Sequence, residues 1–113
     1  MDTRSKIIDL AAARKLRNGG GRLAVAGGAF DVLQTGHARR LAGMRPEGGE
    51  LLVAVWADAG LERPILPEQA RAQLVAALAA VDYVVICRRG DLAVDQEIPD
   101  DRNIIGVVLE RHR

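Results

Sequence analysis

Short apolar runs separated by amphipathic segments make up the pattern of this chain. Three of the runs are continuous and rich in valine, leucine and isoleucine: residues 23–26, 51–56 and 83–87. Continuous apolarity predicts strands that are covered on both faces, as in a parallel sheet. A fourth run, residues 104–109, has the same character despite Gly106 and predicts a further strand.

Three amphipathic segments lie before and between these runs, and each predicts a helix. The first begins at a cap provided by Asp2 or Thr3 and ends before residues 18–21. The second covers residues 36–44, and the third begins at Pro67. The expected buried faces are Ala38, Leu41 and Ala42 in the second helix and Ala70, Leu74, Ala77, Leu78 and Val81 in the third.

The alternation of strands and helices predicts parallel βαβ units and an α/β fold. We expect a Rossmann-like, three-layer α/β/α architecture with a small, mostly parallel sheet of four to five strands. Residues 91–98 predict one more short helix, followed by a turn at 99–101. The whole chain, residues 1–113, is expected to form one domain, with an N-terminal helix and turn at 1–21 and an α/β core at 22–113.

Composition narrows the class of protein. Hydrophobic residues make up 49% of the chain and charged residues 27%, which is typical of a soluble globular domain. A formal net charge of +1 argues against nucleic acid or an anionic membrane as the main partner. Cys87 is the only cysteine, so the sequence predicts neither an internal disulfide nor a multi-cysteine metal site. No apolar run approaches the ~20 residues that span a bilayer, and we expect a cytoplasmic protein.

The stretch from Gly27 to His37 is the strongest indication of chemistry. It joins the first continuous apolar run to a helix that opens at Gly36. Glycines allow the backbone to approach an anion closely, and the first turn of a helix presents unpaired N–H groups to it. His37 lies in that first turn, so the stretch predicts a phosphate-binding loop at the carboxyl edge of the sheet.

The chain resembles the cytidylyltransferase-like nucleotidyltransferases, and within them the heptose-phosphate adenylyltransferase and glycerol-phosphate cytidylyltransferase type. Residues 28–41 are similar to a family block with a G-C-F-D turn and an H-x-G-H motif, which reads Gln34-Thr35-Gly36-His37 here. Residues 52–58 are similar to a strand that ends in Ser or Thr and then Asp. Residues 63–85 are similar to R-P-I-x-P-x-x-x-R, a helix and V-D-x-V.

The resemblance implies transfer of a nucleotidyl group from ATP or CTP to a small phosphorylated substrate, such as a sugar phosphate, with release of pyrophosphate and with Mg²⁺ as cofactor. His37 matches the second histidine of the motif, Gln34 stands in place of the first, and Arg71 matches an arginine expected to contact the triphosphate; these three are the implied catalytic residues. The implied nucleotide-binding residues are Gly27, Gly28, Ala29, Phe30, Gly36, Asp58 and Arg63.

Several of these residues have a second, structural interpretation. His37 either contacts phosphate or only caps its own helix turn, and Asp58 either meets a sugar hydroxyl or magnesium or caps the following turn. Asp31 either braces the glycine loop or touches a ligand. Trp56 lies where the family favours a small polar residue, and it either stacks on a base or fills the pocket.

The chain also departs from the family pattern. Gln34 cannot carry the charge of a histidine, and no lysine lies between Asp58 and Arg63. A serine- and threonine-rich segment expected after residues 104–109 has no counterpart. Two functions therefore stay open: a nucleotidyltransferase, or a weakened or inactive nucleotide-binding domain with a structural or regulatory role. An exposed final strand further predicts a homodimer.

Overall fold

A single parallel sheet organises the computed structural model, which describes residues 2–100. Its strands lie in the order β1-β4-β3-β2-β5, and every pairing is parallel. They are β1 Ile7–Ile8, β2 Leu23–Gly28, β3 Glu50–Trp56, β4 Tyr83–Cys87 and β5 Gln96–Glu97. The predicted α/β class is confirmed, whereas the strand predicted at 104–109 lies outside the described residues.

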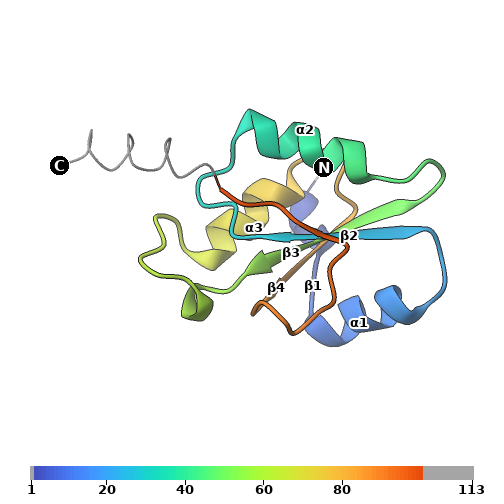
Figure 1. Cartoon of the computed structure of the whole chain (residues 1–113), viewed down its shortest axis with the longest axis horizontal. Helices are drawn as coiled ribbons and strands as arrows, with labels where there is room; N and C mark the ends of the chain where they lie inside the picture. Colours follow the sequence, from blue (N-terminus) through green and yellow to red (C-terminus); the bar gives the residue numbers. More distant parts are fainter. Residues whose placement is uncertain (1, 101–113) are drawn as a thin grey trace.

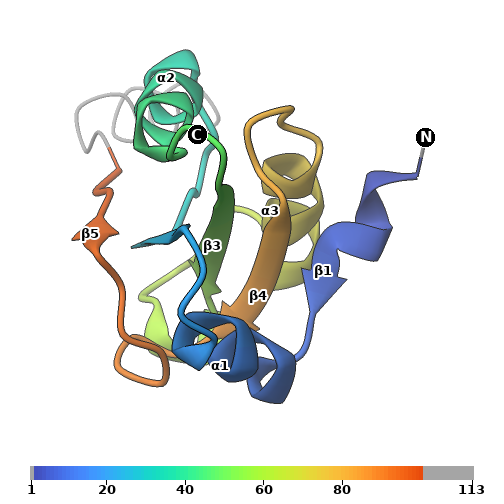
Figure 2. The ribbon, with the colours of Figure 1, turned by 90° about the vertical axis from the view of Figure 1, so that its right-hand side faces the viewer.

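Three α-helices cover the two faces of the sheet: α1 Leu10–Asn18, α2 Thr35–Met44 and α3 Glu68–Ala76. Short 3-10 helices, η1 Thr3–Lys6 and η2 Asp58–Gly60, precede β1 and follow β3. Helix α1 packs on one face, and α2 and α3 pack on the other (Figures 1 and 2). The fold is therefore the three-layer α/β/α arrangement that the sequence predicts.

The alternation of side chains along β3 explains why its sequence is continuously apolar. Leu51, Val53 and Val55 lie in the cluster under α2 and α3. Leu52 and Ala54 lie in the cluster under α1. All five are completely buried, because both faces of a strand in the middle of this sheet are covered by helices.

The first predicted helix is wrong at its start. Ile7 and Ile8 form β1 and pair with the middle of β4. Helix α1 begins only after Asp9, whose carboxylate accepts the N–H of Ala12 at 2.8 Å, while Asp2 caps the short η1. Two adjacent isoleucines fit a helical or a strand period equally well, and the free edge of β4 decides in favour of the strand.

The helix predicted at residues 91–98 is also wrong, because this segment is extended. The N–H of Asp95 donates to the carbonyl of Val25 at 2.7 Å, and the N–H of Ile98 donates to the carbonyl of Gly27 at 2.8 Å. The Asp95 carboxylate in turn accepts the N–H of Val25 and pairs with Arg17. The open edge of β2 thus satisfies the backbone of the segment better than a short helix would.

The expected buried faces of α2 and α3 are partly wrong. In α3 the buried residues are Arg71, Ala72, Val75 and Ala76, whereas Leu74 is 44% exposed. In α2 the buried residues are His37 and Leu41, and Ala42 is exposed. The inward face of each helix includes a polar side chain, which a purely apolar stripe cannot reveal. Among residues 2–100 no helix is long and apolar enough to cross a membrane.

Candidate functional site

The carboxyl ends of β2, β3 and β4 meet at one edge of the sheet, where the sequence predicts the site. Three neighbouring clefts open there, of about 240, 520 and 320 Å³. The first is lined by Trp56 and Arg89, the second by His37 and the start of α2, and the third by Arg63. Asp100 lines all three.

The start of α2 holds the His37 imidazole in one orientation. Gln34 is the N-cap of the helix, and its backbone N–H donates to His37 Nδ1 at 3.0 Å. The ring also meets the edge of Phe30, with 5.5 Å between centroids and an interplanar angle of 82°. Because Nδ1 accepts a hydrogen bond, the neutral ring carries its proton on Nε2. The structure thus shows the capping interpretation of His37, through Nδ1, whereas contact with phosphate stays a prediction that would involve Nε2.

The cleft of about 520 Å³ lies beside this histidine. Gln34, Gly36 and His37 line it, together with the exposed cations Arg39 and Arg40. Gly36 has no heavy atom within 4 Å of where a Cβ would lie, so the first turn of α2 is open on that side. N–H groups of a first helical turn next to two cations form an environment that favours an anion.

Arg71, by contrast, is fully buried and engaged with the protein itself. Its Nε donates to the carbonyl of Leu66 at 2.9 Å, and one terminal nitrogen donates to the carbonyls of Ala29 at 2.8 Å and Trp56 at 2.7 Å. The other terminal nitrogen donates to Asp58 at 2.6 Å. A guanidinium has five N–H donors, so these four bonds leave little of Arg71 for a ligand. Contact with a triphosphate stays a prediction, whereas its part in holding the ends of β2 and β3 is structural.

Asp58 and Asp31 complete a closed network around the start of α3. Asp58 accepts the N–H of Glu68 at 3.2 Å, and Glu68 accepts the N–H of Asp58 at 2.9 Å. The hydrogen bond from Arg71 holds the pKa of the Asp58 carboxyl below its ordinary value. The buried Asp31 accepts the N–H groups of residues 65 and 66 at 2.6 and 2.8 Å. Asp31 thus braces the glycine loop against residues 65–66, whereas Asp58 binds the first residue of α3 and does not cap the turn that follows β3.

The glycines at the end of β2 are required by contacts within this chain. A Cβ on Gly27 would lie 2.7 Å from the indole carbons of Trp56, and one on Gly28 would lie 2.7 Å from the carbonyl oxygen of Ile98. The next residues are Ala29, whose carbonyl is bound by Arg71, and Phe30, which is buried with a φ of 51°. The loop therefore packs tightly against its own protein on this side.

Trp56 fills space at the edge of the sheet. Its side chain is 3% exposed, and its Nε1 donates to Glu97 at 3.3 Å. The guanidinium of Arg89 lies 5.7 Å from the centre of the ring and also pairs with Glu97. Of the two interpretations of Trp56, filling the pocket is the one that the structure shows.

Asp100 is the site residue that the sequence does not single out. Its Oδ2 accepts the N–H of Asp31 at 3.3 Å, and its Oδ1 lies 3.4 Å from His37 Nε2. Burial raises the pKa of this carboxyl above its ordinary value, although the hydrogen bond from the Asp31 N–H opposes that rise. Nothing local in the sequence points to Asp100, because the pairing of β5 with β2 is what brings it to the glycine loop.

The described residues do not offer a ready magnesium site. No group of three or more potential ligands among His, Cys, Asp and Glu occurs within residues 2–100. The oxygens of Asp31 and Asp58 are engaged by backbone N–H groups and by Arg71. Magnesium in proteins often binds through one or two carboxylates together with substrate phosphates, so Mg²⁺ fits this site only as a partner of a nucleotide.

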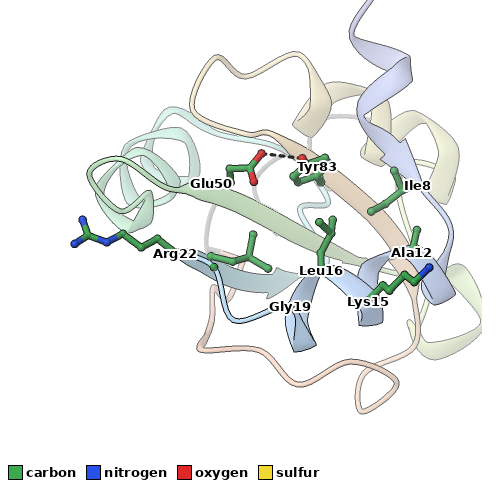
Figure 3. Close-up of a pocket in the computed structure, with 10 residues that line it drawn as sticks. Ile8, Ala12, Lys15, Leu16, Gly19, Arg22, Glu50 and Tyr83 are labelled. Atoms are coloured by element: carbon green, nitrogen blue, oxygen red, sulfur yellow. Dashed lines mark hydrogen bonds between the residues drawn. The ribbon is translucent and has the colours of Figure 1, made fainter.

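Another cleft, of about 560 Å³, lies at the opposite end of the sheet (Figure 3). Leu23, Glu50 and Tyr83, at the amino ends of their strands, line it together with apolar residues of α1. The Tyr83 hydroxyl donates to Glu50 at 2.7 Å, which raises the pKa of Tyr83. Ligands of open parallel sheets bind beyond the carboxyl ends, so this cleft is not the candidate site.

Comparisons with known proteins show which family this chain resembles in sequence and structure. Residues 25–109 match the family described as cytidylyltransferase-like. The bifunctional protein HldE of Koribacter versatilis is 42% identical over 90 residues, which cover 74% of this chain and 18% of the relative. HldE of Halorhodospira halophila is 43% identical over 82 residues, covering 67% of this chain and 17% of the relative. The chain thus spans less than a fifth of the length of these relatives.

A solved structure is similar as well. The lipopolysaccharide core biosynthesis protein from Thermoplasma volcanium matches with a TM-score of 0.56 and 28% identity. The match covers 80% of this chain and 68% of that protein.

Proposed function

Because this chain belongs to the cytidylyltransferase-like family, we propose that it binds a nucleoside triphosphate at the carboxyl edge of its sheet and acts as a nucleotidyltransferase. The donor is ATP or CTP, and the acceptor is a small phosphorylated compound such as a sugar phosphate. The observation that carries the proposal is the fixed imidazole of His37, whose Nε2 is left for a partner in the first turn of α2.

The reaction joins a phosphate oxygen of the acceptor to the α-phosphorus of the nucleotide. The bond from that phosphorus to the bridging oxygen breaks, and pyrophosphate leaves with the electron pair. Such a transfer needs positioning and stabilisation of charge on the phosphoryl oxygens. The Nε2–H of His37 and the open first turn of α2 supply this, while the amide of Gln34 donates a neutral hydrogen bond. Arg71 holds the ends of the two strands that carry the loops.

A bound Mg²⁺ would be held mainly by the phosphates of the nucleotide and would neutralise part of their charge. The chain's own contribution is the set of N–H donors and cations around the cleft. This assignment follows from the engagement of Asp31 and Asp58 by the protein.

A second candidate function is binding without turnover. Two observations favour it: the bonds of Arg71 to protein acceptors, and the indole of Trp56 over Gly27. The first leaves fewer N–H donors for the phosphate that is transferred, and the second leaves less space for a nucleotide base. In this case the domain binds nucleotide or phosphosugar and serves a structural or regulatory role.

Release of pyrophosphate tests the first function. The assay uses ATP or CTP with Mg²⁺ and a panel of sugar phosphates and phospho-alcohols, and it compares the wild type with His37→Ala. Loss of a charge-stabilising donor commonly lowers kcat by about 10²–10³-fold, so we expect a loss of this size. Tyr83→Phe removes a ring hydroxyl at the opposite end of the sheet and is expected to keep wild-type turnover. Absence of pyrophosphate across the panel would reject the enzyme.

A rise in melting temperature with nucleotide, without turnover, supports the binding function instead. Gln34→His then separates two causes of inactivity. A gain of turnover in this variant assigns the loss to the replaced histidine, and no gain assigns it to the remaining departures from the family pattern.

Within residues 2–100, the edges of the sheet offer little backbone through which two copies of the chain could pair as the predicted homodimer. Both edge strands, β1 and β5, are two residues long. Short edge strands discourage pairing between sheets. Light scattering at micromolar concentration tests the prediction, and a monomer mass would contradict it.

A further inference from the structure

Asp100 stands where three clefts meet and faces groups that suit an anion. Its carboxylate lies against the backbone N–H of Asp31, in the loop after β2, and against His37 Nε2, in the first turn of α2. A phosphate bound at the start of α2 would use the same donors. We propose that Asp100 is an internal competitor for phosphate: its carboxylate occupies the anion position, and an incoming phosphate displaces it. This inference rests on the proposed function.

The contacts of Asp100 are loose compared with those of its neighbour Asp31. Asp31 accepts two backbone N–H groups at 2.6 and 2.8 Å. Asp100 accepts one at 3.3 Å, and its other oxygen is buried without a hydrogen bond from any residue of the described range 2–100, 3.4 Å from His37 Nε2. N–H···O bonds in proteins centre near 2.9–3.0 Å, so the first carboxylate is firmly held and the second is weakly held. A buried, under-bonded carboxylate is inexpensive to displace, because it loses little when it returns to water.

Asp100 also lies between clefts that a ligand would have to occupy together. It lines the cleft with Trp56 and Arg89, the cleft with His37 and the cleft with Arg63. A nucleoside triphosphate together with its acceptor is an extended ligand that needs neighbouring clefts at once. Movement of the Asp100 side chain would both free the donors and join the clefts. The competitor therefore acts on the part of the site where the phosphates would lie.

Titration calorimetry with inorganic tripolyphosphate and with Mg-ATP, at fixed ionic strength, tests this inference. The proteins are the wild type, Asp100→Asn, Asp100→Ala and the control Glu47→Gln. Asn keeps the shape of Asp and removes its charge, and Ala removes the side chain. Glu47 is an exposed residue before β3, at the other end of the sheet, so its variant makes the same change in net charge away from the site. Circular dichroism and thermal unfolding establish that each variant is folded.

We expect both Asp100 variants to bind tripolyphosphate and Mg-ATP roughly tenfold more tightly than the wild type, within the about 5- to 150-fold range of coupling between sites or ligands. Glu47→Gln is expected to bind like the wild type. Equal binding by the wild type and the Asp100 variants would overturn the inference and leave the proposed function intact. Weaker binding of Mg-ATP by the variants would also overturn it, since Asp100 would then assist the ligand or its metal. Absence of binding in every protein would reject the proposed function itself.

Discussion

The starts of α2 and α3 lie at the same edge of the sheet, and each carries a residue that the sequence predicts for phosphate. At the start of α3, Arg71 makes four hydrogen bonds of 2.6–2.9 Å to the protein. At the start of α2, His37 is fixed through Nδ1, and its Nε2 lies 3.4 Å from the loosely held Asp100. Two residues with the same predicted role thus differ in what they have left for a ligand. The difference makes the start of α3 a scaffold and supports the proposal that the start of α2 is the binding end of the site.

The largest effect is expected from Arg71→Met. The substitution keeps a long apolar side chain but leaves three backbone carbonyls and Asp58 without their donor. A buried acceptor that is left without its donor costs about 1–3 kcal/mol, and this cost falls on the backbone carbonyls because Asp58 is 38% exposed. Urea unfolding is expected to show a loss of at least this size, because more than one carbonyl is affected, against a typical total of about 5–15 kcal/mol.

The matched control for this prediction is Arg63→Met. Arg63 is exposed and lines one of the clefts. Its substitution is expected to change the free energy of unfolding by less than about 0.5 kcal/mol, as is usual at the surface. Similar small losses in both variants would contradict the scaffold role of Arg71.

Two glycines give the next largest contrast. Gly27→Ala places a Cβ 2.7 Å from the ring of Trp56 and 3.0 Å from Val94, so we expect overpacking to lower the free energy of unfolding by roughly 1–3 kcal/mol. Gly36→Ala places a Cβ in open space in the first turn of α2 and is expected to stabilise by up to about 1 kcal/mol. Thermal unfolding of the two variants measures both. If Gly36→Ala lowered the free energy of unfolding more than Gly27→Ala, the backbone at the end of β2 would be less tightly packed than that at the start of α2.

Two aspartates provide a smaller contrast that depends on pH. The pKa of Asp58 is lowered in the folded chain, so its stabilising contribution is present above its ordinary pKa and is lost as pH falls through the folded value. The pKa of Asp100 is raised by burial, so its contribution is present at low pH and is lost as pH rises through the folded value. The charged or titratable groups that act on Asp100 are Asp31, His37 and Arg71.

Between about pH 3 and about pH 6, the free energy of unfolding of Asp100→Asn, relative to the wild type, is therefore expected to rise with pH. That of Asp58→Asn is expected to fall with pH. Urea unfolding at a series of pH values measures both slopes. If the two slopes had the same sign, the protein would hold the Asp58 and Asp100 carboxylates in the same way. That result would contradict the contrast between the start of α3 as scaffold and the start of α2 as binding end.

The sequence predicts the layers of this fold because both faces of its central strands are covered. Three apolar runs correspond to β2, β3 and β4, and their continuity is a direct result of that burial. The edges of the sheet could not be predicted in the same way. Residues 7–8 and 96–97 are too short to show a period, and their strands form only because β4 and β2 have free edges beside them.

The site shows the same limit. The sequence locates His37 and the glycine loop, because a strand, a turn and a helix that follow one another in the chain place them. It does not reveal that Arg71 is engaged by Ala29 and Trp56, or that Asp100 reaches His37, because these contacts join residues far apart in the chain. The residue types in the sequence indicate which side chains could bind phosphate. Only the folded structure shows which of these side chains already make hydrogen bonds within the protein.

Backbone amide NMR during titration with tripolyphosphate locates the phosphate-binding residues in this chain. If the start of α2 is the binding end, the largest shift changes are expected at Asp31 and at residues 35–38, with those of residues 65–68 unchanged. Wild-type chain and Asp100→Asn should show the same set of residues, with saturation at lower ligand concentration in the variant. If the largest shift changes occurred at residues 65–68 and α2 were unaffected, phosphate would bind at the start of α3, and the start of α2 would not be the binding end.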